Sequence, residues 1–155
     1  MTPEQRQQFD RFGCVPRCII ELSNERGPPI TDDEFCRQFD YLFLTPGEYG
    51  NLIDSQIVEV IRVLDLGHDF HILRRYDAIV WEFGHEHRDV LVLSEIDLRE
   101  NEATPIKHCS LLREIDRDHF RMWIPWNNAP GSERDFAAIA WDSKACHGVV
   151  LVRAR

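Results

Sequence analysis

Two cysteines, Cys14 and Cys18, lie four residues apart at the start of an apolar stretch, in "QFDRFGCVPRCIIEL" at 8–22. The apolar residues at 15, 18, 19 and 22 have helical spacing, which predicts a helix that begins at or just after Cys14. The unpaired N–H groups and the positive dipole end of a helix N-terminus stabilise a thiolate, the nucleophilic form of cysteine. Cys14 is therefore a candidate nucleophile. A redox pair with Cys18 is disfavoured, because residues four apart on a helix rarely meet disulfide geometry without strain.

A cysteine nucleophile needs a base that a rigid element holds in place. Among the histidines the best placed are His108, which opens the apolar run "CSLLREI", and His119, which opens the next run. The remaining five histidines lie at 68, 71, 85, 87 and 147. "HDFH" and "HEH" sit in polar segments without a clear third ligand, so we expect no metal site.

The five cysteines, at 14, 18, 36, 109 and 146, are an odd number without a C-x-x-C pair. This pattern argues against a disulfide framework and against a structural zinc site. We expect most of them to be small residues of the hydrophobic core.

The composition is that of one globular domain spanning 1–155, with 43% hydrophobic and 29% charged residues. The formal net charge of −9 and the absence of a Lys/Arg run argue against nucleic-acid binding. No apolar stretch approaches the roughly 20 residues of a membrane helix. The first ten residues lack the basic start and apolar core of a signal peptide, so we expect a cytoplasmic protein without membrane contact.

The elements that must position these residues divide the chain in two. The first half predicts three helices: one from Cys14 to "GPP" at 27–29, one after Thr31, and one from Asp54 or Ser55 to Gly67. The second half has short apolar or alternating runs typical of antiparallel strands: "DVLVLSEI", "CSLLREI", "HFRMWI", "DFAAIAW" and "GVVLVRA". "DFAAIAW" would suit a short helix equally well, and "EIDRDHF" predicts a hairpin turn. The fold class is α+β, with helices leading and an antiparallel sheet following.

"QFDRFGCVPRC" resembles the active-site opening of papain-like cysteine peptidases, and most closely that of the peptidases that process double-glycine bacteriocin leaders. That family has a glutamine, five residues and the catalytic cysteine, often with a second cysteine four positions on. Gln8, Cys14 and Cys18 keep this spacing. The resemblance continues through "GPPITDDEF", "IVEVIRVLDLG", "RDVLVLSEI", "KHCSLLREIDRDHFRMWIPW" and "SERDFAAIAWDSKACHGVVLV", and so covers nearly the whole chain.

The resemblance implies a papain-like fold in which Cys14 is the nucleophile and His108 its general base and later general acid. Gln8 would donate to the oxyanion beside the Cys14 backbone N–H. His119, beyond the hairpin turn, would then be structural or lie at the rim of the site.

Two positions depart from the family pattern. Ile124 stands where the family has the aspartate that orients the histidine, and Val15 stands where it has a glycine. Asn127, three residues beyond Ile124, could take the orienting role, since asparagine plays it in many papain-like enzymes, and Asp142 in "AWDSK" is the alternative. A dyad without an orienting group is the third possibility, at a cost of several orders of magnitude in rate.

A cysteine, a histidine and an amide oxyanion hole specify acyl transfer through a thioester, with no cofactor. The acyl donor could be a peptide bond or a glutamine side chain, which would make a peptidase or a deamidase or transglutaminase. The chain has no nucleotide-binding G-x-x-x-x-G-K-[ST] loop. It therefore resembles the papain-like toxin modules that bacteria deliver into other cells, and the implied partners are a protein or peptide substrate and a neutralising immunity protein. An inactive papain-like module that binds peptides is the competing class.

Overall fold

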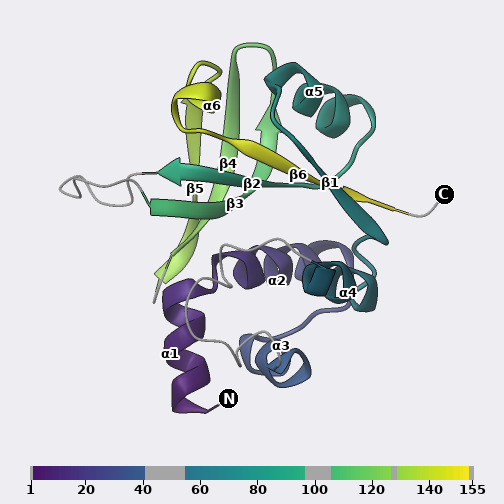
Figure 1. Cartoon of the computed structure of the whole chain (residues 1–155), viewed down its shortest axis with the longest axis vertical. Helices are drawn as coiled ribbons and strands as arrows, with labels where there is room; N and C mark the ends of the chain where they lie inside the picture. The colour runs from purple at the N-terminus through teal and green to yellow at the C-terminus, as the bar shows by residue number, and fades with distance from the viewer. Residues whose placement is uncertain (1, 41–54, 97–105, 127–128, 154–155) are drawn as a thin grey trace. The chain divides into compact units, whose positions relative to one another are not determined.

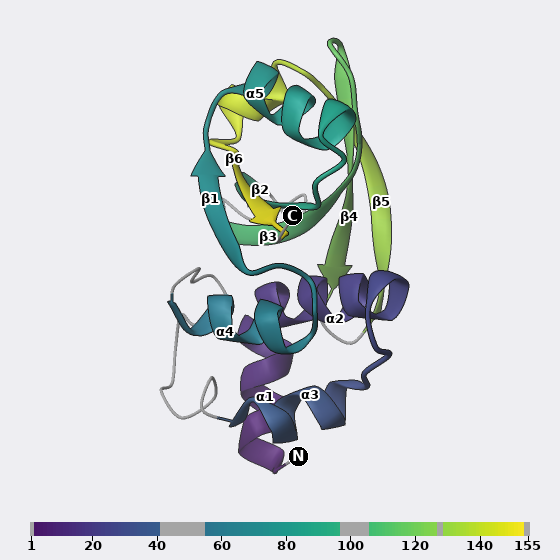
Figure 2. The ribbon, with the colours of Figure 1, turned by 90° about the vertical axis from the view of Figure 1, so that its right-hand side faces the viewer.

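The structure is a computed structural model that describes residues 2–40, 55–96, 106–126 and 129–153. By its contacts the chain divides into two compact units (Figures 1 and 2). We call Met1–Phe70, with Pro125–Pro130 and Val152–Arg155, the helical unit, and His71–Ile124, with Gly131–Leu151, the sheet unit.

The helical unit contains four helices. They are α1 (Pro3–Phe12), α2 (Cys14–Arg26), α3 (Asp32–Gln38) and α4 (Ser55–Val63). The predicted helix from Cys14 to the "GPP" stop is confirmed as α2, with Gly27 as its C-cap. Helix α1 was not predicted, because "PEQRQQFDRF" carries only two apolar residues and no helical stripe.

The second predicted helix, α3, begins as its sequence indicates. Thr31 is the N-cap: its hydroxyl accepts from the Glu34 backbone N–H at 3.1 Å, and the Glu34 carboxylate accepts from the Thr31 N–H at 2.9 Å. The third, α4, starts at Ser55 as expected but ends at Val63, earlier than the predicted stop at Gly67. Asp65, with φ of 56°, turns the chain before that glycine.

The core of the helical unit is built from the apolar faces of these helices. Phe9 of α1, Val15 and Ile19 of α2, Phe35 of α3 and Ile61 of α4 are all fully buried. Burial of this apolar surface is the main favourable term that holds α1 and α2 in place. Cys14 is thus attached to a packed element.

The sheet has six strands, and the order across it is β1-β6-β2-β3-β4-β5. The strands are β1 (Asp69–Leu73), β2 (Val90–Ile96), β3 (Ile106–Ile115), β4 (His119–Trp126), β5 (Ala129–Ala137) and β6 (His147–Val152). β2 pairs antiparallel with both β3 and β6, and β3 pairs antiparallel with β4. The expectation of an α+β chain, with helices followed by an antiparallel sheet, is confirmed.

The predicted turn between β3 and β4 is a hairpin turn organised by Asp116. Its carboxylate accepts from the backbone N–H groups of Asp118 at 2.7 Å and His119 at 2.9 Å. These two hydrogen bonds lower the pKa of Asp116 below its ordinary value. The Tyr76 hydroxyl donates to the Asp116 carbonyl at 2.5 Å, which fixes the turn to the segment that follows β1.

Strand β1 and two short helices of the sheet unit were not predicted. α5 (Tyr76–Val80) continues into the π-helical turn η3 (Trp81–His85). The apolar run "AIVWEF" is too short and too aromatic to show a helical period. The ambiguous "DFAAIAW" divides between the end of β5 and α6 (Ala140–Ser143).

Helix α5 packs closely on the sheet at a position occupied by glycine. A Cβ at Gly148 of β6 would overlap the Cδ1 methyl of Ile79 and approach a Val90 methyl to 3.2 Å. At the start of α5, the Tyr76 ring contacts Trp141 of α6, with centroids 5.7 Å apart. The helices α5 and α6 are therefore held by packing contacts, because helices this short are not stable on their own.

Within the described residues, no helix has the length and apolar character needed to span a membrane.

Candidate active site

Cys14 lies at the junction of two helices rather than after a loop. Gly13 alone separates α1 from α2, and its N–H donates to the Phe9 carbonyl at 2.9 Å. A Cβ at Gly13 would overlap that same carbonyl oxygen, so the approach of α1 to α2 requires glycine there. Val15, at the position where the peptidase family that the sequence resembles has a glycine, is fully buried in the core of the helical unit.

The first turn of α2 sets the surroundings of Cys14. It contains no acidic residue, and Cys14 is partly exposed to solvent. A partly exposed cysteine at a helix N-terminus has the environment of a reactive thiol. The structure thus places Cys14 at the first residue of α2, as the predicted helix start requires.

Gln8 lies in α1, six residues before Cys14, and its side chain lies outside the described part of the structure. The orientation of α1 against α2 is set by Arg17. Its guanidinium donates to the Asp10 carboxylate at 2.9 Å and stands 4.5 Å from the centroid of the Phe9 ring. The backbone that carries Gln8 is therefore fixed relative to α2.

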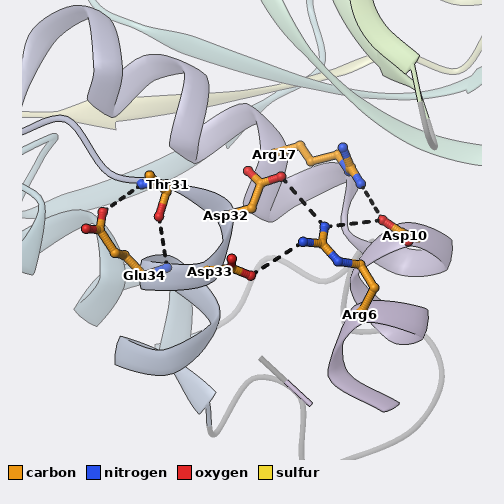
Figure 3. Close-up of polar contacts among 7 residues, drawn as sticks. All are labelled: Arg6, Asp10, Arg17, Thr31, Asp32, Asp33 and Glu34. Carbon is orange, nitrogen blue, oxygen red and sulfur yellow. Dashed lines mark hydrogen bonds and ion pairs between the residues drawn. The ribbon is translucent and has the colours of Figure 1, made fainter. Parts of the chain in front are cut away.

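The ion pair between Arg17 and Asp10 belongs to a network that joins three helices (Figure 3). Arg6 of α1 lies 3.8 Å from Asp10 and reaches the start of α3, at 4.0 Å from Asp32 and 3.4 Å from Asp33. These pairs are more exposed than the Arg17 pair and contribute less to stability. We assign the network a structural role.

The other four cysteines are buried, and none of the five, all within the described residues, is in a disulfide. Burial raises the pKa of Cys36 to about 12 and that of Cys146 to about 12. Both are therefore thiols, not thiolates, at neutral pH. Cys14 is the only cysteine of the chain that combines exposure with a helix N-terminus.

His108 differs from the other histidines in its burial. All seven lie in the described residues, and His108, at 9% exposure, is the only one that is buried. It lies in β3, where it is held by pairing with β2. His119 lies at the exposed start of β4, with its Nδ1 3.3 Å from the Asp116 carboxylate. His108 is thus the histidine that is both buried and paired within the sheet.

Two serines near His108 were missed by the sequence interpretation. Ser94 of β2 is directly opposite His108 in the strand register, and Ser110 is two residues further along β3. Both are buried, and neither hydroxyl has a hydrogen-bond partner in the described part of the molecule. The visible signal was a serine inside the apolar run "VLVLSEI", although its partner depends on a register that the sequence does not supply.

The position of the missing aspartate, Ile124, and its two candidate replacements, Asn127 and Asp142, differ in what the structure describes of them. Ile124 is fully buried in β4, and its side chain cannot accept a hydrogen bond. Asn127 lies outside the described residues. Asp142 is exposed in α6 of the sheet unit.

Cys14 belongs to the helical unit and His108 to the sheet unit. The structure therefore describes the environment of each residue within its own unit. No group of three or more His, Cys, Asp or Glu side chains in the described ranges could hold a metal ion.

No family model, curated protein or solved structure matches the chain. Its function must therefore be proposed from its own residues.

Proposed function

We propose that the chain is a papain-like cysteine peptidase that acts by acyl transfer from Cys14. One observation carries the proposal. Cys14 is the one cysteine with the exposure and helix position of a nucleophile, and His108 is the one histidine that is buried on a strand. Thiol chemistry needs an accessible sulfur and a base in a defined orientation, which these two residues supply.

In the proposed reaction, His108 takes the proton from the Cys14 thiol and the sulfur attacks the carbonyl carbon of the substrate. The tetrahedral oxyanion accepts hydrogen bonds from the Gln8 amide and the Cys14 backbone N–H. The C–N bond breaks when His108 returns the proton to the leaving amine. Water, deprotonated by His108, then hydrolyses the thioester and restores the thiol.

The substrate is a protein or peptide, and a cytoplasmic target reached by delivery of the chain into another cell fits the resemblance to toxin modules. A matching immunity protein would then cover Cys14. Expression of the chain in the cytoplasm of a bacterium tests this role. Growth arrest that Cys14→Ala abolishes supports it, and unaffected growth argues against it.

Alkylation kinetics test the central claim. The rate at which iodoacetamide modifies Cys14 is measured against pH by mass spectrometry in the wild type, His108→Ala and His119→Ala. Rapid modification well below the free-thiol pKa of about 8.5, lost in His108→Ala and kept in His119→Ala, establishes a thiolate–imidazolium pair. A rate that titrates like an ordinary thiol and ignores His108 overturns the proposal.

A deamidase or transglutaminase uses the same residues on a glutamine side chain. Peptide mass spectrometry separates the two activities, because a peptidase shortens the chain whereas a deamidase converts Gln to Glu without cleavage.

A catalytically inactive peptide-binding module is the second candidate function. The buried Ile124 at the position of the family's aspartate favours it. A module of this kind would bind peptide equally well as Cys14→Ala and would show no acyl-enzyme with any peptide ester.

A further inference from the structure

Ser94 and His108 face each other across the pairing of β2 with β3. Residues opposite each other in an antiparallel pair share one face of the sheet, as do residues two apart in one strand. Ser94, His108 and Ser110 therefore lie on the same face. Their exposed fractions are 4%, 9% and 0%, so this part of the face is closed to solvent.

The hydroxyl groups of Ser94 and Ser110 are both buried, and neither has a hydrogen-bond partner among the described residues. A buried hydroxyl without a partner is unfavourable, and such groups in a native protein call for an explanation. The two serines differ in what stands opposite. Ser110 pairs with Val92, whose side chain offers no polar atom, whereas Ser94 pairs with an imidazole.

We propose that Ser94 is a positioning residue for His108, and that its hydroxyl holds the imidazole in a single tautomer. The Cβ atoms of directly opposed residues are about 4.5–5.5 Å apart. Rotation of the Ser94 χ1 angle from one staggered position to another can turn the hydroxyl oxygen toward the His108 ring across that distance. A hydroxyl can accept from one ring N–H and leaves the other nitrogen unprotonated for proton transfer.

The strand residues paired around Ser94 and His108 on their face of the sheet are uncharged. Among the described strand pairs, the residues that share this face, up to the irregularity at Leu112/Glu114, carry no carboxylate: Val90, Val92, Ile96, Ile106, Ser110, Leu112, Met122, Gly148 and Val150. Among these strand positions, the two serines carry the hydroxyl groups that could bond the imidazole.

The position of β2 also favours Ser94 over Asp142. The Glu95 N–H donates to the Lys144 carbonyl at 2.8 Å, which places the segment after α6 on the β6 side of β2. β3 lies on the other side of β2, and two strand spacings amount to about 9.6 Å. Ser94 belongs to the strand between them and is adjacent to His108.

This inference rests on the proposed function for its catalytic meaning, because His108 must be the base for its orientation to matter. A neutral hydroxyl contributes less than a carboxylate. We expect Ser94→Ala to slow alkylation of Cys14 at neutral pH by about fivefold, the effect of one ordinary hydrogen bond.

The test is ¹⁵N NMR of protein labelled at histidine, with the His108 signals assigned by their loss in His108→Ala. Nitrogen shifts distinguish the two neutral tautomers of an imidazole. We compare the wild type with Ser94→Ala, Ser94→Thr and Ser110→Ala. Ser110→Ala is the matched control, because it removes a second buried, unpartnered hydroxyl from the same face. Ser94→Thr keeps the hydroxyl on a residue that suits a strand.

The expected result is one tautomer in the wild type, in Ser94→Thr and in Ser110→Ala, and a mixture in Ser94→Ala. An unchanged spectrum in Ser94→Ala, or the same change in Ser110→Ala, overturns the inference. Should Ser94→Ala fail to fold, Ser94→Cys takes its place, since a thiol is a weak acceptor.

The two proposals fail separately. If His108→Ala leaves the rate of Cys14 alkylation unchanged, the peptidase proposal is overturned. The tautomer measurement still shows whether Ser94 bonds His108. If His108→Ala slows alkylation while Ser94→Ala alters neither the rate nor the spectrum, only the role of Ser94 is overturned.

Discussion

Arg17 of α2 donates to the Asp10 carboxylate of α1 at 2.9 Å, and the side chains of both residues are less than a quarter exposed. The same guanidinium lies over the Phe9 ring. The pair therefore joins the helix that carries Gln8 to the first turns of the helix that carries Cys14.

We predict that Arg17→Met lowers the free energy of unfolding by about 1.5–3 kcal/mol, the range for hydrogen bonds to charged groups. Urea denaturation followed by circular dichroism measures the change. Arg17→Lys should recover only part of the loss, because lysine keeps the charge but not the planar fork.

Arg6→Ala is the control for this prediction. The Arg6 side chain is 46% exposed and its ion pairs are longer, so we expect a loss of at most about 0.5 kcal/mol. Equal losses for Arg6→Ala and Arg17→Met would contradict the distinction between the exposed and the part-buried pairs.

The accessibility of the thiols predicts selective modification. Iodoacetamide should modify one site, Cys14, in the native protein and five sites after denaturation, as counted by intact mass. Cys14→Ser should abolish native modification. Modification of Cys36 or Cys146 in the folded state would contradict their burial and raised pKa values.

The N-cap of α3 predicts a pH dependence. The hydrogen bond from the Thr31 backbone N–H is the main reason why the pKa of Glu34 lies below its ordinary 4.5. The side-chain hydrogen bond with Thr31 lowers this pKa further. A lowered carboxyl pKa stabilises the fold above 4.5, and this stabilisation is lost as the pH falls through the lowered value. Melting temperatures of wild type and Glu34→Gln should therefore differ at neutral pH and converge in acid.

Two variants control the N-cap prediction. Glu59→Gln, which removes an exposed carboxylate of α4 outside the capping box, is the matched control for loss of a charge. Thr31→Ala, which removes the other half of the capping box, should cost about 1 kcal/mol. A constant difference between wild type and Glu34→Gln at every pH would count against the bond to Thr31.

The contact between Gly148 and Ile79 predicts a coupled pair. Gly148→Ala should destabilise the protein by about 1–3 kcal/mol through overpacking. Ile79→Val removes the methyl that the new Cβ would meet. The double variant should therefore lose less stability than the sum of the losses in the two single variants. Additive losses in denaturant unfolding would show that α5 does not press on this point of the sheet.

Sequence patterns predicted those elements whose ends are set by local chemistry. The capping residues Thr31 and Glu34 identify the start of α3, and Gly27 identifies the end of α2. The hairpin at Asp116 follows from side-chain hydrogen bonds within the turn itself. Such bonds involve neighbours in the chain, so the sequence contains all of their determinants.

Elements fixed by distant contacts were missed. Helix α1 has few apolar residues and is held by Phe9 and Arg17, and α5 is held by its packing against Gly148. Cys14 and His108 could be selected because their residue types carry chemistry. Ser94 could not, since its importance lies in the residue opposite, and strand register is a property of the folded sheet.

The burial of four of the five cysteines also gives the protein a natural attachment point for a reporter group. A thiol-reactive fluorophore added to the unmodified chain would be confined to the junction of α1 and α2. Trp81, Trp123 and Trp141 belong to the sheet unit and can serve as energy donors. Fluorescence energy transfer from tryptophan to the label would report on the surroundings of Cys14, with no cysteine removed or introduced.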